Sequence, residues 1–97
     1  MIYANGSLDI NGTTYSTSDG IKFQLVMYPN SVFVLTDNSD ASAWISAKGL
    51  TSISKSAAQA LVDTSTSNAQ SRWDALSDEE KLVDYGGRPR PQAMVLP

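Results

Sequence analysis

The chain contains neither cysteine nor histidine among its 97 residues. Without cysteine it has no disulfide, no thiolate nucleophile and no thiolate metal ligand. Without histidine it lacks the commonest general base and the commonest ligand of transition metals. A serine nucleophile would need a lysine base, in an unrecognised arrangement with Lys22, Lys48, Lys55 or Lys81. We therefore expect that the chain is not an enzyme and has no catalytic residue, cofactor, metal ion or small-molecule substrate.

Charge is also sparse. Charged residues make up 18% of the sequence and leave a formal net charge of −3. A protein that tracks phosphates needs a basic face, so we expect no nucleic-acid partner. No apolar run reaches the roughly 18 residues of a membrane span, and Met1–Ala4 lacks the basic start of a secretory signal. We expect a soluble chain with no membrane partner, made in the cytoplasm.

The most apolar stretch, residues 21–36, predicts a β-hairpin. Its first half alternates with a period of two, which is typical of a strand with one buried face. The residues expected on that face are Ile21, Phe23, Leu25 and Met27. Val32–Leu35 is β-branched and aromatic and predicts the partner strand. Pro29 and Asn30 suit the two central positions of the turn between them. A second hairpin is predicted around Asn11-Gly12, a pair that favours a two-residue turn.

The following segment predicts a short helix over Ala41–Lys48. Either Ser39 or Asp40 can cap its start, and Gly49 ends it. Its expected inner face carries Ala41, Trp44 and Ile45. Asp37, Asn38 and Asp40 could be oxygen ligands for calcium, but they lack the spacing of an EF-hand loop. A polar turn leading into a helix cap is the favoured interpretation of this acidic loop.

The second half of the chain predicts further helices. Ser52 or Ser54 can cap a helix that ends near Val62, and its inner stripe would be Ala57, Ala58, Leu61 and Val62. Asp63–Ser67 is expected to be a linker. Beyond it, one helical face is expected to carry Ala69, Trp73 and Leu76. Ser77–Glu80 has the form of a capping box, so a last helix should begin there and end at Gly86-Gly87.

Together these features predict an α+β fold, with N-terminal antiparallel β-hairpins, two or three short helices and an extended C-terminal arm. We expect residues 1–87 to form a single domain and residues 88–97 to form the arm. Prolines exclude the start of the arm from a helix or a central strand, and its apolar end should dock on its own core or on a neighbouring chain. The residues expected to bind a partner are Arg88, Pro89, Arg90, Pro91, Met94, Val95 and Leu96.

Two pieces, about a third of the chain, resemble small tail or neck proteins of tailed bacteriophages. The piece Arg72–Lys81 is similar to a Trp-x-x-Leu-Ser/Thr-x-Glu-Glu-Lys segment of tail, tail-fibre-assembly and neck proteins. The other piece, similar to the opening of short tail accessory proteins, comprises Tyr28–Ser31, Phe33, Asp37–Asp40 and Trp44-Ile45. The chain departs from this family where Ile21–Met27 alternates as a strand and where Gly86-Gly87 stops the last helix. The resemblance implies a structural or assembly role and no catalytic residue.

Three functional hypotheses follow. The favoured one is a non-enzymatic tailed-phage virion component of the tail, neck or baseplate, made in the host cytoplasm. Its partners would be phage structural proteins, copies of itself, or both. The second is a small acidic inhibitor or anti-defence protein that binds a host enzyme and presents its acids, Asp74, Asp78, Glu79, Glu80 and Asp84. The third is a carbohydrate-binding module with a Trp and Tyr face, although core packing is the favoured role of Trp44 and Trp73.

Overall fold

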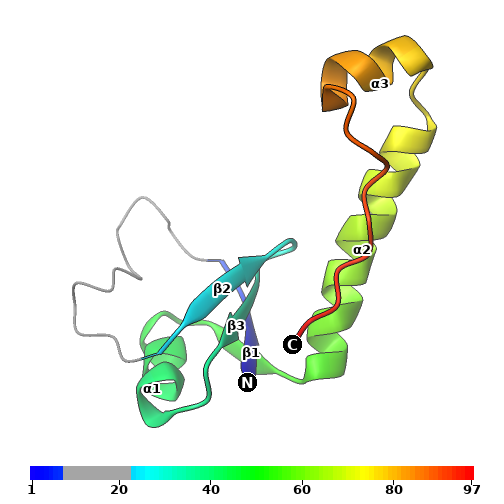
Figure 1. Ribbon diagram of the computed structural model, residues 1–97. Helices are drawn as coiled ribbons and strands as arrows, with labels where there is room; N and C mark the ends of the chain where they lie inside the picture. The colour runs from blue at the N-terminus through cyan, green and yellow to red at the C-terminus, as the bar shows by residue number, and fades with distance from the viewer. Residues whose placement is uncertain (8–22) are drawn as a thin grey trace.

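A four-stranded antiparallel sheet forms the centre of the structure, a computed structural model that describes residues 1–7 and 23–97 (Figure 1). The order of its strands is β2-β3-β1-β4. The strands are β1 (Ile2–Asn5), β2 (Leu25–Tyr28), β3 (Val32–Leu35) and β4 (Thr51–Ile53). The helices are α1 (Ser39–Ala47), α2 (Lys55–Asp74) and α3 (Asp78–Tyr85). The predicted α+β class is confirmed. The predicted hairpin at Asn11-Gly12 lies outside the described residues.

Strands β2 and β3 form the predicted hairpin, with Leu25 opposite Leu35 and Tyr28 opposite Val32. The loop therefore has three residues rather than two, because Ser31 adopts the left-handed conformation (φ 58°) as well as Asn30 (φ 65°). The Asn5 side chain stabilises the loop by donating to the carbonyl oxygens of Asn30, at 3.1 Å, and Ser31, at 2.9 Å. Sequence reasoning missed this long-range support.

The burial predicted for the first strand of this hairpin is partly wrong. Phe23 is buried and Leu25 is half-buried, but Met27 is exposed. The reason is topological, because β2 is an edge strand of the sheet and its end has a strand neighbour on one side only. Ile21 lies outside the described residues.

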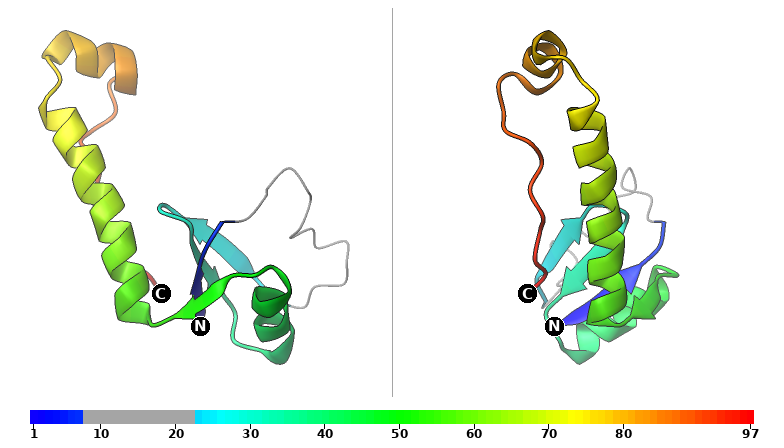
Figure 2. Two further views of the ribbon diagram at one scale, coloured as in Figure 1. Left: turned by 180° about the vertical axis from the view of Figure 1, so that it is seen from behind. Right: turned by 90° about the vertical axis from the view of Figure 1, so that its right-hand side faces the viewer.

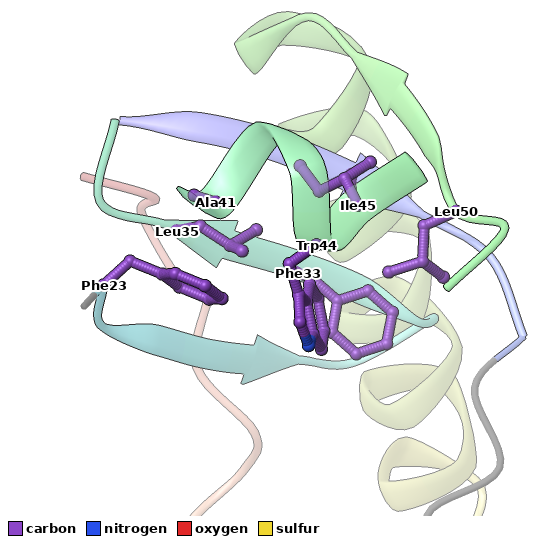
Figure 3. Packing of buried hydrophobic residues seen from close by; sticks show 8 residues of the cluster. Phe23, Phe33, Leu35, Ala41, Trp44, Ile45 and Leu50 are labelled. Carbon is purple, nitrogen blue, oxygen red and sulfur yellow. The ribbon is translucent and has the colours of Figure 1, made fainter. Parts of the chain in front are cut away.

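The two faces of the sheet carry separate hydrophobic clusters. Helix α1 packs on one face, where the Phe23 and Trp44 rings lie with their centroids 5.7 Å apart (Figure 3). The buried members of this cluster are Ala4, Phe23, Phe33, Leu35, Ala41, Trp44, Ile45 and Leu50. Helix α2 and the end of the chain cover the other face. The buried members there are Tyr3, Val32, Val34, Ala58, Val62 and Leu96.

Helix α1 has the predicted inner face, but its cap is Asn38 rather than Ser39 or Asp40. The Asn38 side chain accepts a hydrogen bond from the Ala41 N–H at 2.8 Å. At the other end, Gly49 has a φ of 69°, and its N–H donates to the Ser46 carbonyl oxygen while that of Leu50 donates to the Ile45 carbonyl oxygen. This is a Schellman ending, so the predicted role of Gly49 is confirmed.

Helix α2 is a single helix of 20 residues, so the linker predicted over Asp63–Ser67 is wrong. These residues have modest helix propensity, about 0.5 kcal/mol each below alanine, but no glycine or proline interrupts them. Burial of Thr66 offsets part of that cost. Ser54 is the N-cap, as one of the two alternatives proposed. Ala58 and Val62 are buried as predicted, whereas Ala57 is exposed.

Strand β4 was not predicted, because its three residues are too few to show a hydrophobic period. The start and end of α3 are as predicted. Ser77 and Glu80 form a capping box, and Gly86 ends the helix in the left-handed conformation. Leu76 lies beyond the end of α2 rather than on it. Within residues 1–7 and 23–97, no helix has both the length and the apolar character that crossing a bilayer requires.

The molecule is elongated, with principal extents of 48 × 28 × 19 Å. The second half of α2 projects beyond the sheet and carries α3 at its far end (Figures 1 and 2). The last ten residues return from α3 along α2 and end beside the sheet. The candidate site lies on this projection.

Candidate protein-binding surface

The arm, Arg88–Pro97, runs antiparallel to α2 (Figure 2). It reverses direction after α3 through two consecutive glycines in the left-handed region, Gly86 (φ 58°) and Gly87 (φ 82°). The Arg88 N–H then donates to the Tyr85 carbonyl oxygen at 3.0 Å. The arm therefore packs in cis in this structure, one of the two alternatives that the sequence left open.

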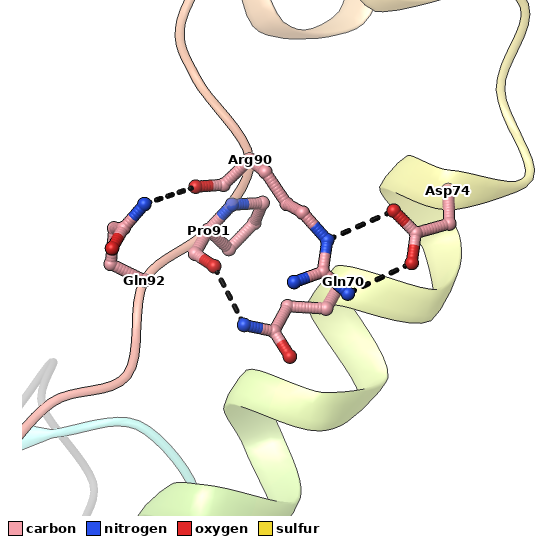
Figure 4. A network of polar contacts seen from close by, with 5 residues as sticks. All are labelled: Gln70, Asp74, Arg90, Pro91 and Gln92. Carbon is pink, nitrogen blue, oxygen red and sulfur yellow. Dashed lines mark hydrogen bonds and ion pairs between the residues drawn. The ribbon is translucent and has the colours of Figure 1, made fainter.

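A polar contact holds the start of the arm to the projecting half of α2 (Figure 4). Arg90 donates from Nε and Nη2 to the two carboxylate oxygens of Asp74, both at 2.9 Å. Gln70 Nε2 donates to the Pro91 carbonyl oxygen at 2.9 Å. The hydrogen bond from Arg90 lowers the pKa of Asp74, and the same bond raises the pKa of Arg90. Because both side chains are about half exposed, the ion pair fixes the position of the arm on α2 more than it adds to stability.

A second polar contact holds the end of the arm at the base of α2. The Gln59 side chain pairs with the backbone much as a neighbouring strand would. Its Nε2 donates to the Met94 carbonyl oxygen at 2.7 Å, and its Oε1 accepts from the Leu96 N–H at 2.9 Å. The Tyr3 hydroxyl donates to the carbonyl oxygen of Pro97. The two Gln59 contacts therefore bind backbone atoms of an extended segment.

Leu96 is the apolar anchor of the arm. Its side chain is 2% exposed and packs in the cluster between the sheet and α2. Full burial of a leucine stabilises by about 1.5–3 kcal/mol. Ordering each backbone residue costs about 1–2 kcal/mol, so this cost offsets much of what the leucine and the hydrogen bonds of the arm contribute. Three prolines in the arm reduce this cost by restricting the free chain.

The structure separates the seven residues predicted to bind a partner into two groups. Arg90, Pro91 and Leu96 contact α2 or the sheet of the same chain, and Arg88 donates to Tyr85. Pro89, Met94 and Val95 remain exposed, with Val95 at 85%. Binding of a partner through these seven residues stays a prediction.

Helix α3 presents an exposed apolar pair that the sequence analysis did not name among the candidate binding residues. Leu82 is 65% exposed and Val83 is 77% exposed, and no residue of α3 is buried. The helix contacts α2 through a cation–π interaction of Lys81, whose Nζ lies 3.8 Å from the centroid of the Trp73 ring. The sequence signal that could have revealed this pair is two adjacent apolar residues in a short acidic helix. Two glycines follow that helix.

The stripe of α2 under the arm was also missed. Gln59 and Asp63 are four residues apart, and Gln70 and Asp74 repeat this pair eleven residues later. Eleven residues are close to three helical turns, so the two pairs share a face. Gln59 also donates to Asp63 Oδ1 at 2.9 Å. The repeat was visible in the sequence, but nothing in it indicated that a later segment would lie on this face.

The residues considered for other chemistry are placed as follows. Trp44 and Tyr3 are buried, so they offer no stacking face, and the Lys81 ammonium covers the half-buried Trp73. Hydrogen bonds from the Ser77 backbone and side chain lower the pKa of Glu80 within the capping box. An open hollow is lined by Arg72, Asp84 and Tyr85. No group of acids suited to a metal ion occurs in the described part of the chain.

Comparison with known proteins adds no relative, since no protein-family model, curated protein or solved structure matches the chain.

Proposed function

We propose that the chain is a non-enzymatic structural or assembly protein that acts through protein–protein contacts. Following the resemblance of Arg72–Lys81, we propose that it is a small virion component of a tailed phage, in the tail, neck or baseplate. The supporting observation is α3, a helix with an exposed Leu82-Val83 pair and no buried residue. We define these two residues as the tip pair.

Helix α3 is short, which supports the proposal that it functions in contact with a partner. It has eight residues, whereas isolated helices shorter than about 12–15 residues are marginal in water. The capping box, three acids in the first turn and the left-handed Gly86 favour the helix locally. Burial of the tip pair would add about 1.5–3 kcal/mol for each side chain. A protein surface that covers this pair would supply the stabilisation that the isolated helix lacks.

The test is incorporation of tagged variants into phage particles during infection. We expect Leu82→Ser with Val83→Ser to remove the chain from purified particles, because the partner contact loses its apolar centre. Glu79→Ser is the matched control, since Glu79 is an exposed residue of the same helix, and it should enter particles like the unaltered chain. Equal incorporation of both variants would contradict the role of the tip pair. Absence of the unaltered chain from particles would contradict a virion role.

A further inference from the structure

We infer that the arm exchanges between copies of this chain, so that the arm of one molecule occupies the α2 stripe and the Leu96 site of a second. The inference rests on the proposed assembly function and specifies a second copy as a partner. It concerns the arm and the stripe on α2, whereas the preceding proposal concerns the tip pair.

The occupant of the site is known, because the arm itself lies there. The stripe recognises an extended backbone through Gln59 and Gln70, a guanidinium through Asp74, and a leucine through the apolar cluster beneath it. The arm of a second copy carries the same groups at the same spacing. It can therefore make every one of these contacts without any new surface.

The connection to α3 permits the exchange. Gly86 and Gly87 are both left-handed, and a Cβ atom on either would meet nothing within 4 Å. The reversal is therefore a local backbone conformation that packing does not enforce. When it opens, a ten-residue arm can span about 33 Å, comparable with the roughly 30 Å length of a 20-residue helix.

Release of the arm leaves the Leu96 site empty, and the arm of another copy can fill it. Leu96 shares the apolar cluster between the sheet and α2 with Tyr3, Val34 and Val62, so this cluster loses part of its cover when the arm leaves. Covering this apolar surface favours capture of another arm. A reciprocal exchange gives a two-fold dimer. Since each arm leaves from the end that carries α3, the exchange also brings the two tip pairs close together.

Concentration decides between the closed and exchanged forms. A segment tethered by a short linker has an effective concentration in the millimolar range. Exchange should therefore be minor in dilute solution and populated when copies are crowded, as they are inside an assembly. This dependence can be measured directly.

Cysteine crosslinking provides the experiment, because the chain has no cysteine of its own. Tagged Asp74→Cys and untagged Arg90→Cys chains are unfolded together in urea, refolded at about 1 mM total protein, and treated with a short bis-maleimide. Denaturing gels then separate the mixed dimer from both like dimers by the mass of the tag. Asp40→Cys replaces Asp74→Cys in the control, since Asp40 is exposed on α1, across the sheet from the arm.

We expect several-fold more mixed dimer with Asp74→Cys than with Asp40→Cys, falling towards the control level on dilution. Leu96→Ala in the Arg90→Cys chain should remove the excess, and Val95→Ala should retain it. Mixed dimer at the control level, or an excess that Leu96→Ala leaves unchanged, would overturn arm exchange. Neither result would affect the proposed function, which is tested through the tip pair in particles.

Discussion

Leu96→Ala is the most informative single substitution, because Leu96 joins the arm to the core. The leucine is 2% exposed and lies among Tyr3, Val34 and Val62. Buried leucine-to-alanine substitutions cost about 2–5 kcal/mol, depending on how well the site can relax. Here the arm can detach instead of holding a cavity open, so the loss cannot exceed the free energy of docking the arm. We therefore expect a loss of about 2–3 kcal/mol, at the lower end of that range.

The assay is equilibrium unfolding in urea, followed by circular dichroism at a low protein concentration that disfavours exchange. In a thermal scan, the same loss should lower the midpoint by about 10–20 °C for a domain of this size. Val95→Ala is the matched control, since the neighbouring valine is 85% exposed. Its effect should stay within about 0.5 kcal/mol. If the two variants unfold alike, Leu96 is not inserted in the core and the docking argument is refuted.

Three further predictions concern single contacts. Ser77→Ala removes the N-cap of α3 and should cost about 1 kcal/mol of local stability, seen as faster hydrogen exchange in α3 but not in β1 or β3. Gly6→Ala should destabilise the fold by about 1–3 kcal/mol in urea unfolding, because φ is +154° there and the new Cβ would lie 2.9 Å from Leu50 Cδ2; an unchanged midpoint would contradict this. Because Arg90 lowers the pKa of Asp74 in the folded state, the ion pair stabilises arm docking above about pH 4, and this contribution is lost as the pH falls through the lowered pKa. The protection factor of the Leu96 amide against hydrogen exchange, which is measured relative to the intrinsic rate at each pH, should therefore fall on acidification, and Asp74→Asn should remove the part of that change due to the ion pair.

Features that depend on one turn of chain were predictable from the sequence. The capping box at Ser77 and the ending at Gly49 depend only on residues three to five positions apart. The linker prediction over Asp63–Ser67 failed because propensity is a weak prior that tertiary packing overrides. The cap at Asn38 was missed because asparagine, serine and aspartate compete closely at that position.

The docked state of the arm was only partly predictable. Its prolines and apolar end indicated an extended segment that leans on a surface, and Leu96 was among the residues named. The choice between its own chain and a neighbour depends on distances that no local pattern encodes. Gln59 and Gln70 were likewise invisible as arm contacts until α2 proved to be continuous, since a linker at Asp63–Ser67 would have separated them.

The arm couples the two ends of the projection. Its lower end inserts Leu96 beside the sheet, and its upper end pairs Arg90 with Asp74, the last residue of α2 and four residues before the start of α3. The lower part of α2 packs on the sheet through Ala58 and Val62, whereas its upper part is braced by the arm. Docking of the arm therefore steadies the base on which α3 presents the tip pair. Because such coupling is reciprocal, a partner that holds the tip in place should also strengthen insertion of Leu96, whether that leucine belongs to the same chain or to the next.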